Sequence, residues 1–340
     1  MKHALGTFLV IVLSLISTGC VHEWPRTPDT RKVSLHVSHE LPWNLFEWKH
    51  PALGSRSTDP ALLMSRYIFA VYPKGADKEP PSQKFFVYRY DLERSDFDVD
   101  LDLPAGEWDV RIWSDNAYAD TGESPFYDPD DFGAITYAEP FIGNDSYKDA
   151  FMGVVQVSVP DIDEREPTGC YGQVTLRRPL TAFAFIATDL KEFIEQEETR
   201  ARERQGEQQP PSQRPPISLG DYSVRIDYSG FLPSVYHHFT DRPIDSSTGV
   251  GFSAGISAIN DSEALTGYDF VFINGQESTI RVTMNLFHRD GTHIARVASF
   301  DIPVKRNRCT VVRGEFLTSK ATGSTGIDPG FSGDFNIEYQ

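Results

Sequence analysis

Alternation of apolar and polar residues between Phe97 and Trp113 constrains the fold more than any other feature of the sequence. Pro104–Gly106 divides this stretch into two halves, and aspartate fills the polar positions of the first half. The apolar set is Phe97, Val99, Leu101, Leu103, Trp108, Val110 and Ile112. A period of two with one apolar face is typical of antiparallel strands that bury one side. The stretch therefore predicts a β-hairpin.

The same period recurs along most of the 340-residue chain, and helical periodicity is nearly absent. Further strands are predicted at 33–37, 66–72, 84–90, 152–159, 222–228, 280–286, 309–317 and 335–339. Many short strands separated by turn signals are characteristic of β-sandwiches. The length accommodates two domains. We therefore expect an all-β protein with two tandem sandwich domains, at residues 33–172 and 173–340.

The segment Val174–Ile194 lies at the expected junction of these domains. We interpret Val174–Ala187 as the opening strand of the second domain. Pro179 interrupts it, and because proline donates no ladder hydrogen bond, an edge position or a bulge is expected there. Asp189 then resembles a helix N-cap with Glu192 as its capping-box partner.

A polar insertion, residues 195–216, follows this short helical turn. It opens with mixed charges and ends in a run rich in proline and glutamine. Segments without apolar periodicity seldom carry core contacts. We expect a short helical, Pro/Gln-rich insertion in the second domain that folding can dispense with.

The N-terminus predicts a processing signal. Leu5–Ile16 is a short apolar run, and small residues lead from it to Cys20. The sequence STGC resembles a bacterial lipobox, in which the cysteine becomes the lipidated first residue. We expect a lipoprotein signal peptide at 1–19 and a lipid-anchored tether at 20–32. An ordinary signal peptide cleaved near residue 19 is the alternative.

The formal net charge of −17 limits the partners of the protein. Nucleic acid is not expected, because phosphate binding needs a basic surface. An acidic surface suits a soluble exported domain that resists self-association.

Two cysteines remain after the predicted lipidation site, Cys170 and Cys309. An exported chain permits a disulfide between them. Two buried thiols are the alternative, and the sequence leaves the choice open.

One catalytic pattern occurs, the G-x-S-x-G of Gly251–Gly255. A nucleophile elbow needs a strand, a sharp turn and then a helix, whereas Ser253 lies in a Ser/Gly-rich run among predicted strands. Asp269 or Asp290 would nominally complete a triad with His293. Because the elbow context is missing, we predict no catalytic residue and no enzyme.

Metal and cofactor sites are not expected either. The residues considered are His36, His39, His237, His238, Asp128, Asp130 and Asp131. The histidines lack an HExxH spacing or cysteine partners, and the aspartates lack the spaced loop and final glutamate of a calcium site. Surface or interface histidines and a solvated acidic loop are the expected structures.

Tryptophans suggest a different function. Trp43, Trp48 and Trp113 are of the type that stacks on a sugar ring or a host ligand. A surface lipoprotein that binds glycan or host ligand is therefore the alternative to a structural subunit.

The second half resembles a family of lipoproteins from Bacteroides-like bacteria, related to fimbrillins and to the minor, anchor-type subunits of their fimbriae. The matching stretches are Leu176–Phe193, Tyr228–Asp245, Gly267–Ser278, Ile302–Ser319 and the terminal GIDPGFSGDFNIE. The resemblance implies transthyretin-like β-sandwich domains, an outer-membrane lipid anchor and a surface-exposed position. It also implies fimbrial partner subunits that join by exchange of a β-strand.

Two terminal strands are the candidates for that exchange. They are Val33–Val37 and the segment that carries Phe335, Ile337 and Tyr339, and the second is preferred because anchor-type subunits are expected to keep their first strand. Both have alternating apolar residues that suit a neighbour's groove. The alternative is that each strand completes its own sandwich.

Overall fold

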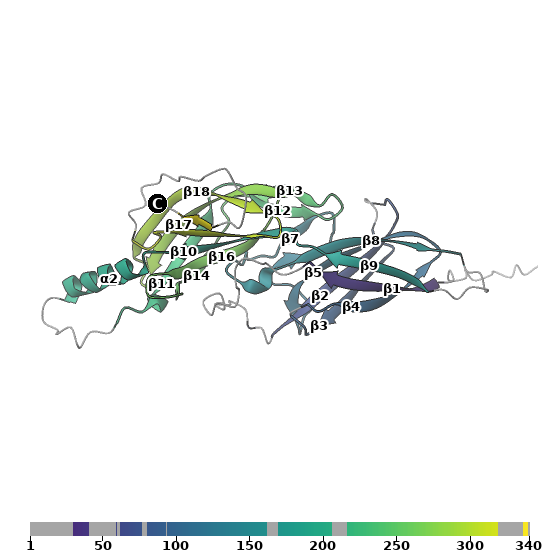
Figure 1. Ribbon diagram of the computed structural model, residues 1–340, viewed down its shortest axis with the longest axis horizontal. Coiled ribbons are helices and arrows are strands. Elements are labelled where there is room, and N and C mark those ends of the chain that lie inside the picture. Colours follow the sequence, from purple (N-terminus) through teal and green to yellow (C-terminus); the bar gives the residue numbers. More distant parts are fainter. Residues whose placement is uncertain are drawn as a thin grey trace, which may run out of the picture.

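The protein is described by a computed structural model that places residues 30–40, 59, 62–76, 80–92, 94–161, 169–205, 216–318 and 336–338. The molecule is elongated and has two lobes built almost wholly of β-strands (Figure 1). The predicted all-β class is therefore confirmed. Within these residues, no helix is both long enough and apolar enough to cross a membrane.

The first lobe is a sandwich of a three-stranded and a four-stranded sheet. The three-stranded sheet has the order β4 (Phe97–Pro104), β1 (Thr30–His39), β9 (Cys170–Leu176). The four-stranded sheet has the order β3 (Gln83–Arg89), β2 (Leu63–Pro73), β5 (Gly106–Tyr118), β8 (Phe151–Val159). Buried apolar residues from both sheets fill the space between them.

The predicted hairpin at Phe97–Trp113 is wrong, although both of its strands exist. β4 pairs with β1, whereas β5 pairs with β2 and β8, so the two strands lie in opposite sheets. Leu101 of β4 and Val110 of β5 meet in the same core. A hairpin and a crossing between sheets bury the same alternate residues, so the period alone did not distinguish them.

The second lobe packs a five-stranded sheet on a four-stranded one. The first has the order β15 (Ser257–Ala258), β16 (Ala264–Phe272), β10 (Leu180–Ala187), β19 (Cys309–Gly314), β20 (Asn336–Glu338). The second has the order β14 (Gly251–Gly255), β11 (Tyr222–Tyr228), β17 (Glu277–His288), β18 (His293–Lys305). Phe185 of β10 contacts Phe300 of β18 across the core, with ring centroids 5.9 Å apart.

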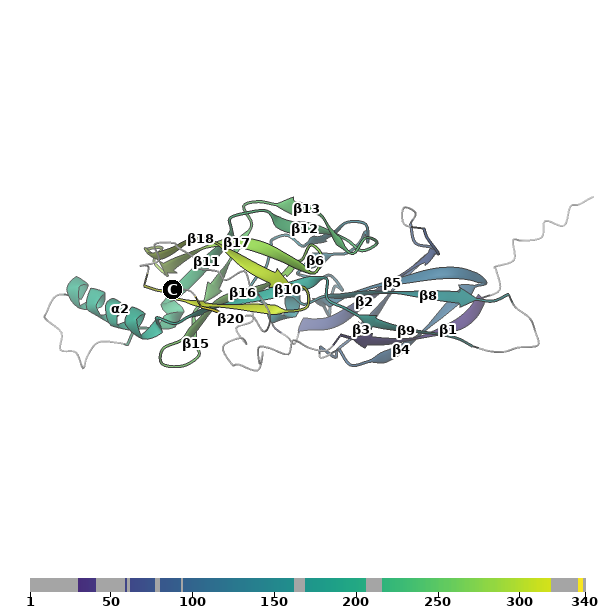
Figure 2. The same cartoon turned by 45° about the horizontal axis from the view of Figure 1, so that its top comes forward.

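A small sheet joins the two halves of the chain. Its order is β13 (Arg242–Ser247), β12 (Leu232–His237), β7 (Ile135–Tyr137), β6 (Tyr127–Asp128). β12 and β7 pair through Tyr236 and Ile135. One continuous core then includes Trp113 of the first lobe and Phe272 of the second. The lobes therefore share one core where they meet, and Figure 2 shows the two lobes end to end.

The junction strand differs from the prediction. Val174 and Leu176 belong to β9 and to the core of the first lobe, while β10 begins at Leu180 in the second. Pro179 lies between two strands of different sheets, neither on an edge nor in a bulge of one strand. Since proline cannot continue a ladder, the chain changes sheets here, and the two cores divide near residue 178, not at 173.

The helix also differs from the prediction. It runs as α2 from Leu190 to Gln205 and so includes the first half of the polar insertion. α2 projects from the end of the molecule that lies far from the first lobe (Figure 1). Glu197 is buried and accepts a hydrogen bond from the Tyr222 hydroxyl at 2.9 Å. This part of the insertion therefore contacts the second lobe, contrary to expectation.

Candidate functional site

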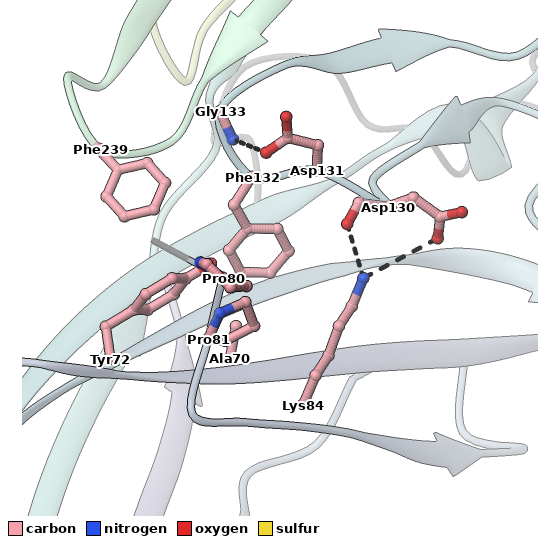
Figure 3. A pocket seen from close by; sticks show the side chains of 10 residues that line it. All are labelled: Ala70, Tyr72, Pro80, Pro81, Lys84, Asp130, Asp131, Phe132, Gly133 and Phe239. Atoms are coloured by element: carbon pink, nitrogen blue, oxygen red, sulfur yellow. Dashed lines mark hydrogen bonds and ion pairs between the residues drawn. The ribbon is translucent and has the colours of Figure 1, made fainter. Parts of the chain in front are cut away.

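A pocket of about 530 Å³ opens where the two halves of the chain meet (Figure 3). Its lining residues are Ala70, Tyr72, Pro80, Pro81, Lys84, Asp130, Asp131, Phe132, Gly133 and Phe239. The pocket thus combines an apolar floor of rings with a rim of charged side chains. Alternation in β2 places Ala70 and Tyr72 on the face turned toward the joining sheet.

The rim of the pocket is held by local hydrogen bonds. Lys84 Nζ donates to the Asp130 carbonyl oxygen at 2.8 Å, and the Asp130 side chain is 91% exposed. The Asp131 carboxylate accepts from the Gly133 backbone N–H at 2.7 Å. The Asp130 carboxylate is exposed but also forms an ion pair with Lys84 Nζ at 3.9 Å. Among the described residues, no group of potential metal ligands is found.

His238 packs against Phe132, one of the residues that line the pocket. The His238 ring stacks on Phe132 with centroids 4.9 Å apart. Its Nε2 lies 3.0 Å from the Ile112 carbonyl oxygen, which can only accept, so Nε2 carries the proton. Burial lowers the pKa of His238 to about 4, and the ring is neutral at physiological pH. His238 is therefore an interior histidine and not one of the surface or interface histidines that were expected.

An exposed aromatic row leads away from the pocket along β3. One face of β3 carries the alternate residues Lys84, Phe86 and Tyr88. In the ladder with β2 these residues lie opposite Ala70, Ile68 and Arg66. Phe86 and Tyr88 are 44% and 43% exposed, and Tyr90 beyond them is 82% exposed. The rings of Phe86 and Tyr88 are parallel within 8°, with centroids 6.2 Å apart. We call Lys84, Phe86, Tyr88 and Tyr90 the β3 row.

A second distinctive place is the outer edge of β19. β19 pairs in parallel with β10 on one side. On the other side, within the described residues, it pairs only with the three residues of β20, also in parallel. Val312 of β19 is 1% exposed and lies opposite Ile337. A buried strand therefore has its outer edge closed by a short segment from the end of the chain.

The carboxylate of Asp189 fixes the chain just after β19. It accepts hydrogen bonds from the backbone N–H groups of Phe316, Leu317 and Thr318 and from the Thr318 hydroxyl, at 2.7 to 3.2 Å. Asp189 is 4% exposed. The predicted helix cap is therefore corrected: this side chain anchors a distant segment, and only its backbone oxygen receives a helical N–H, from Phe193.

The predicted site residues are not brought together as a catalytic group. Gly251–Gly255 forms the edge strand β14, so Ser253 is not on a nucleophile elbow. Asp269 is completely buried and bonded to Lys148, while Asp290 lies in a turn and pairs with His288. His36 pairs with Asp98, and His39 packs between Tyr67 and Phe151.

The aromatic ligand prediction is corrected at Trp113, which is fully buried. Trp43 and Trp48 lie outside the described residues, as do Cys20, Phe335 and Tyr339. Of the predicted exchange segment, Ile337 lies in β20.

Both remaining cysteines are free thiols in the structure, Cys170 half-buried and Cys309 buried. They lie in different lobes, on β9 and β19. The sequence left open a disulfide or two separate thiols, and the structure has two separate thiols.

Sequence reasoning missed the β3 row. The segment KFFVYRY is apolar at nearly every position, which is typical of a strand buried on both faces. β3 lies at the edge of its sheet, and three of the four rings in this segment, those of Phe86, Tyr88 and Tyr90, stay exposed. The usable signal was the run of aromatic residues flanked by Lys84 and Arg89, since charges mark an edge strand.

Comparison with known proteins gives one family match. A family described as a family of unknown function (DUF6562) matches residues 28–340. No curated protein matches the chain.

Among solved structures, the fimbrial anchor protein Mfa2 from Porphyromonas gingivalis is 9% identical, with 79% of this chain and 82% of that chain covered and a TM-score of 0.40. A candidate cell adhesion protein from Bacteroides eggerthii is 9% identical, with coverage of 92% and 98% and a TM-score of 0.43. A candidate polysaccharide-binding protein from Bacteroides thetaiotaomicron is 10% identical, with coverage of 78% and 79% and a TM-score of 0.42.

Proposed function

The chain belongs to a family of unknown function, DUF6562, and we propose that it is a lipid-anchored, cell-surface subunit of a fimbria that joins other subunits through an added β-strand. Cys20 carries the lipid in this proposal, and the anchor holds the elongated body at the outer membrane. Several acyl chains make such attachment persistent, whereas one chain binds only marginally.

The observation that carries the proposal is the outer edge of β19. An open strand edge is a template for pairing with another chain, and proteins normally close it. Among the described residues, β20 closes it with three paired residues, Asn336, Ile337 and Glu338. The pairing is parallel, so no tight hairpin holds β20 in place. β20 can therefore leave this edge while β10, β16 and β19 stay paired.

Strand addition would use the same interactions in a neighbouring subunit. Backbone hydrogen bonds supply affinity, and alternate side chains in pockets fix the register. Val311 and Val312 of β19 are both buried, which gives this edge an apolar setting. The terminal segment pairs within its own chain until a partner subunit offers a comparable edge.

Truncation of the last six residues tests this proposal. Deletion of 335–340 should leave a folded, membrane-bound protein that no longer co-purifies with partner subunits from cells. The matched control is Tyr171→Ala, which changes an 83% exposed residue of β9 in the other lobe. If the truncated protein folds and still recovers every partner, strand joining through this end is wrong. If it unfolds, β20 is a structural strand of its own lobe.

Ligand binding is a second function, and the β3 row with its adjoining pocket favours it. Exposed aromatic rings are uncommon on a monomer surface and mark interaction sites. From Lys84 to Tyr90 the row extends about 20 Å at roughly 3.3 Å per residue, which suits an extended chain of sugars. The exposed carboxylate of Asp130, beside Lys84, would accept hydroxyl hydrogen bonds at one end. Because the protein is strongly acidic, a neutral glycan fits better than an anionic one.

Titration with neutral oligosaccharides tests this second function. Phe86→Ala and Tyr88→Ala should each weaken binding by about threefold to tenfold, since a ring contact contributes about 0.5–1.5 kcal/mol. Tyr171→Ala again serves as the control. Absence of saturable binding in the wild type, or an equal loss in the control, would refute a glycan site on β3.

A further inference from the structure

A lysine and an aspartate from the two halves of the chain meet in the fused core. Lys148 lies in the short 3-10 helix Ser146–Lys148, and Asp269 lies in the centre of β16. Lys148 Nζ is 2.9 Å from Asp269 Oδ1 and 3.1 Å from Oδ2. Both residues have an exposed fraction of 0%. Nζ is thus in reach of the carboxyl carbon in a site without solvent.

Aromatic residues enclose the amine. Nζ lies 3.8 Å from the ring centroid of Phe141 and 4.8 Å from that of Tyr137. Tyr127 closes the site from the side of the first lobe, where its hydroxyl donates to the Lys148 carbonyl oxygen at 2.6 Å. These rings keep water away from the pair and hold Lys148 in one position.

Each oxygen of the Asp269 carboxyl group has a hydrogen-bond donor besides Lys148. Oδ1 accepts from the Phe270 backbone N–H at 2.8 Å. Oδ2 accepts from the Tyr228 hydroxyl at 2.6 Å. One oxygen therefore faces a backbone donor of the type that stabilises an oxyanion, and the other faces a hydroxyl that can protonate a leaving group.

Burial also favours the reactive protonation states. Burial lowers the pKa of Lys148, although Asp269 and then Asp145 oppose this effect. Burial raises the pKa of Asp269, opposed by Lys148 and Tyr228. Proton transfer from the ammonium to the carboxylate removes two buried charges, which are costly in a dry site. It leaves a neutral amine against a neutral carboxylic acid.

We propose that Lys148 and Asp269 condense into an intramolecular amide that covalently links the two halves of the chain. The Nζ lone pair attacks the Asp269 carboxyl carbon, and the negative charge that develops on Oδ1 is stabilised by the Phe270 N–H. Oδ2 carries the proton that the ammonium gave up, and the C–Oδ2 bond then breaks as Tyr228 donates a second proton to that oxygen. The proton lost from Nζ returns to Tyr228. One water leaves, and no oxidant, reductant or cofactor is consumed.

Fixed geometry makes this condensation feasible without an enzyme. Well-oriented intramolecular groups react as if present at about 10⁵–10⁸ M. The product amide is held away from water, so hydrolysis lacks its second reactant. The link would join the 3-10 helix Ser146–Lys148 of the first half to β16 of the second and keep the lobes together under the pulling force that a surface protein meets.

Peptide mapping of the full chain decides the question. The folded protein is purified, denatured and digested with trypsin, and the peptides are sequenced by mass spectrometry. The expected product is one branched peptide that joins the segment containing Lys148 to the segment containing Asp269. Trypsin does not cleave after an acylated lysine, so the branched peptide keeps the Lys148–Asp149 bond, and its mass should equal the sum of the two uncut segments less one water. Recovery of only linear peptides from folded wild-type protein, with cleavage after Lys148, overturns the proposal.

Two variants test whether the bond depends on the Lys148 amine and the Tyr228 hydroxyl. Lys148→Arg keeps a cation but removes the amine nucleophile, so only linear peptides should appear. Tyr228→Phe keeps the ring and removes the hydroxyl, and the branched peptide should form more slowly or not at all while the folded yield persists. A loss of water that maps to another aspartate, or that persists in Lys148→Arg, also overturns the proposal.

Discussion

Replacement of Asp189 by alanine should destabilise the second lobe more than any surface charge change in α2. The carboxylate of Asp189 is 4% exposed and accepts from three backbone N–H groups and one hydroxyl of Phe316–Thr318. Hydrogen bonds to a charged group contribute about 1.5–3 kcal/mol each, and a buried donor left without a partner costs about 1–3 kcal/mol. These contributions are not additive, so we expect a loss of about 3–5 kcal/mol, at the upper end for single substitutions.

Two companion variants sharpen this test. Asp189→Asn retains one accepting oxygen and should lose about 1–2 kcal/mol, because the charge and half of the acceptors are removed. Glu192→Ala removes the exposed residue that the sequence pattern assigned to a capping box. It should change the free energy of unfolding by no more than about 0.5 kcal/mol, as is usual for surface positions.

Urea unfolding at neutral pH measures the three free energies, and hydrogen exchange at Leu317 and Thr318 reports the local effect. In Asp189→Ala these amides should lose protection before the strands of β10 and β16 do. A loss below about 1 kcal/mol for Asp189→Ala, or an equal loss for Glu192→Ala, would show that Asp189 acts as a helix cap and not as the anchor of the segment after β19.

Three further outcomes are expected. Burial lowers the pKa of His238 to about 4, so below pH 6.5 the unfolded state binds a proton that the folded state does not. Up to about 3 kcal/mol of stability is therefore lost as the pH falls from 6.5 to 4. In His238→Gln, the free energy of unfolding should depend less steeply on pH over this range. Replacing residues 206–215 by a short Gly/Ser linker should move the Tm by less than about 2 °C. Replacing residues 195–215 in the same way should lower the Tm further, because this change also removes buried Glu197. Cys20→Ser should shift the protein from the membrane to the soluble fraction, and wild type alone should incorporate labelled palmitate.

Local patterning accounts for the parts of the fold that were predicted. The alternation at 97–103 and 222–228 corresponds to β4 and β11, because side chains of a strand point to opposite faces whatever its partners are. The all-β class followed from the same periodicity. Pro179 marked a real break, since a missing N–H interrupts any ladder.

Strand pairing and long-range contacts could not be predicted from local patterning. The two strands around Pro104–Gly106 entered opposite sheets, although the sequence pattern suits a hairpin equally well. Asp189 resembled a helix cap because the capping pattern is local, yet its donors lie 127 to 129 residues away. The candidate sites share this property: the pocket combines Tyr72, Asp130 and Phe239, which no spacing rule connects.

The sequence by itself determined the strand class, most strand positions and the acidic character of the chain, because these depend on residue type and on periods of a few residues. Only the tertiary structure decided that β12 would pair with β7 and fuse the lobes, that Trp113 would be buried while Phe86 and Tyr88 stayed exposed, and that Lys148 would meet Asp269. These outcomes depend on which surfaces pack together over more than a hundred residues. Burial then sets the pKa shifts and the hydrogen bonds that give such residues their chemistry.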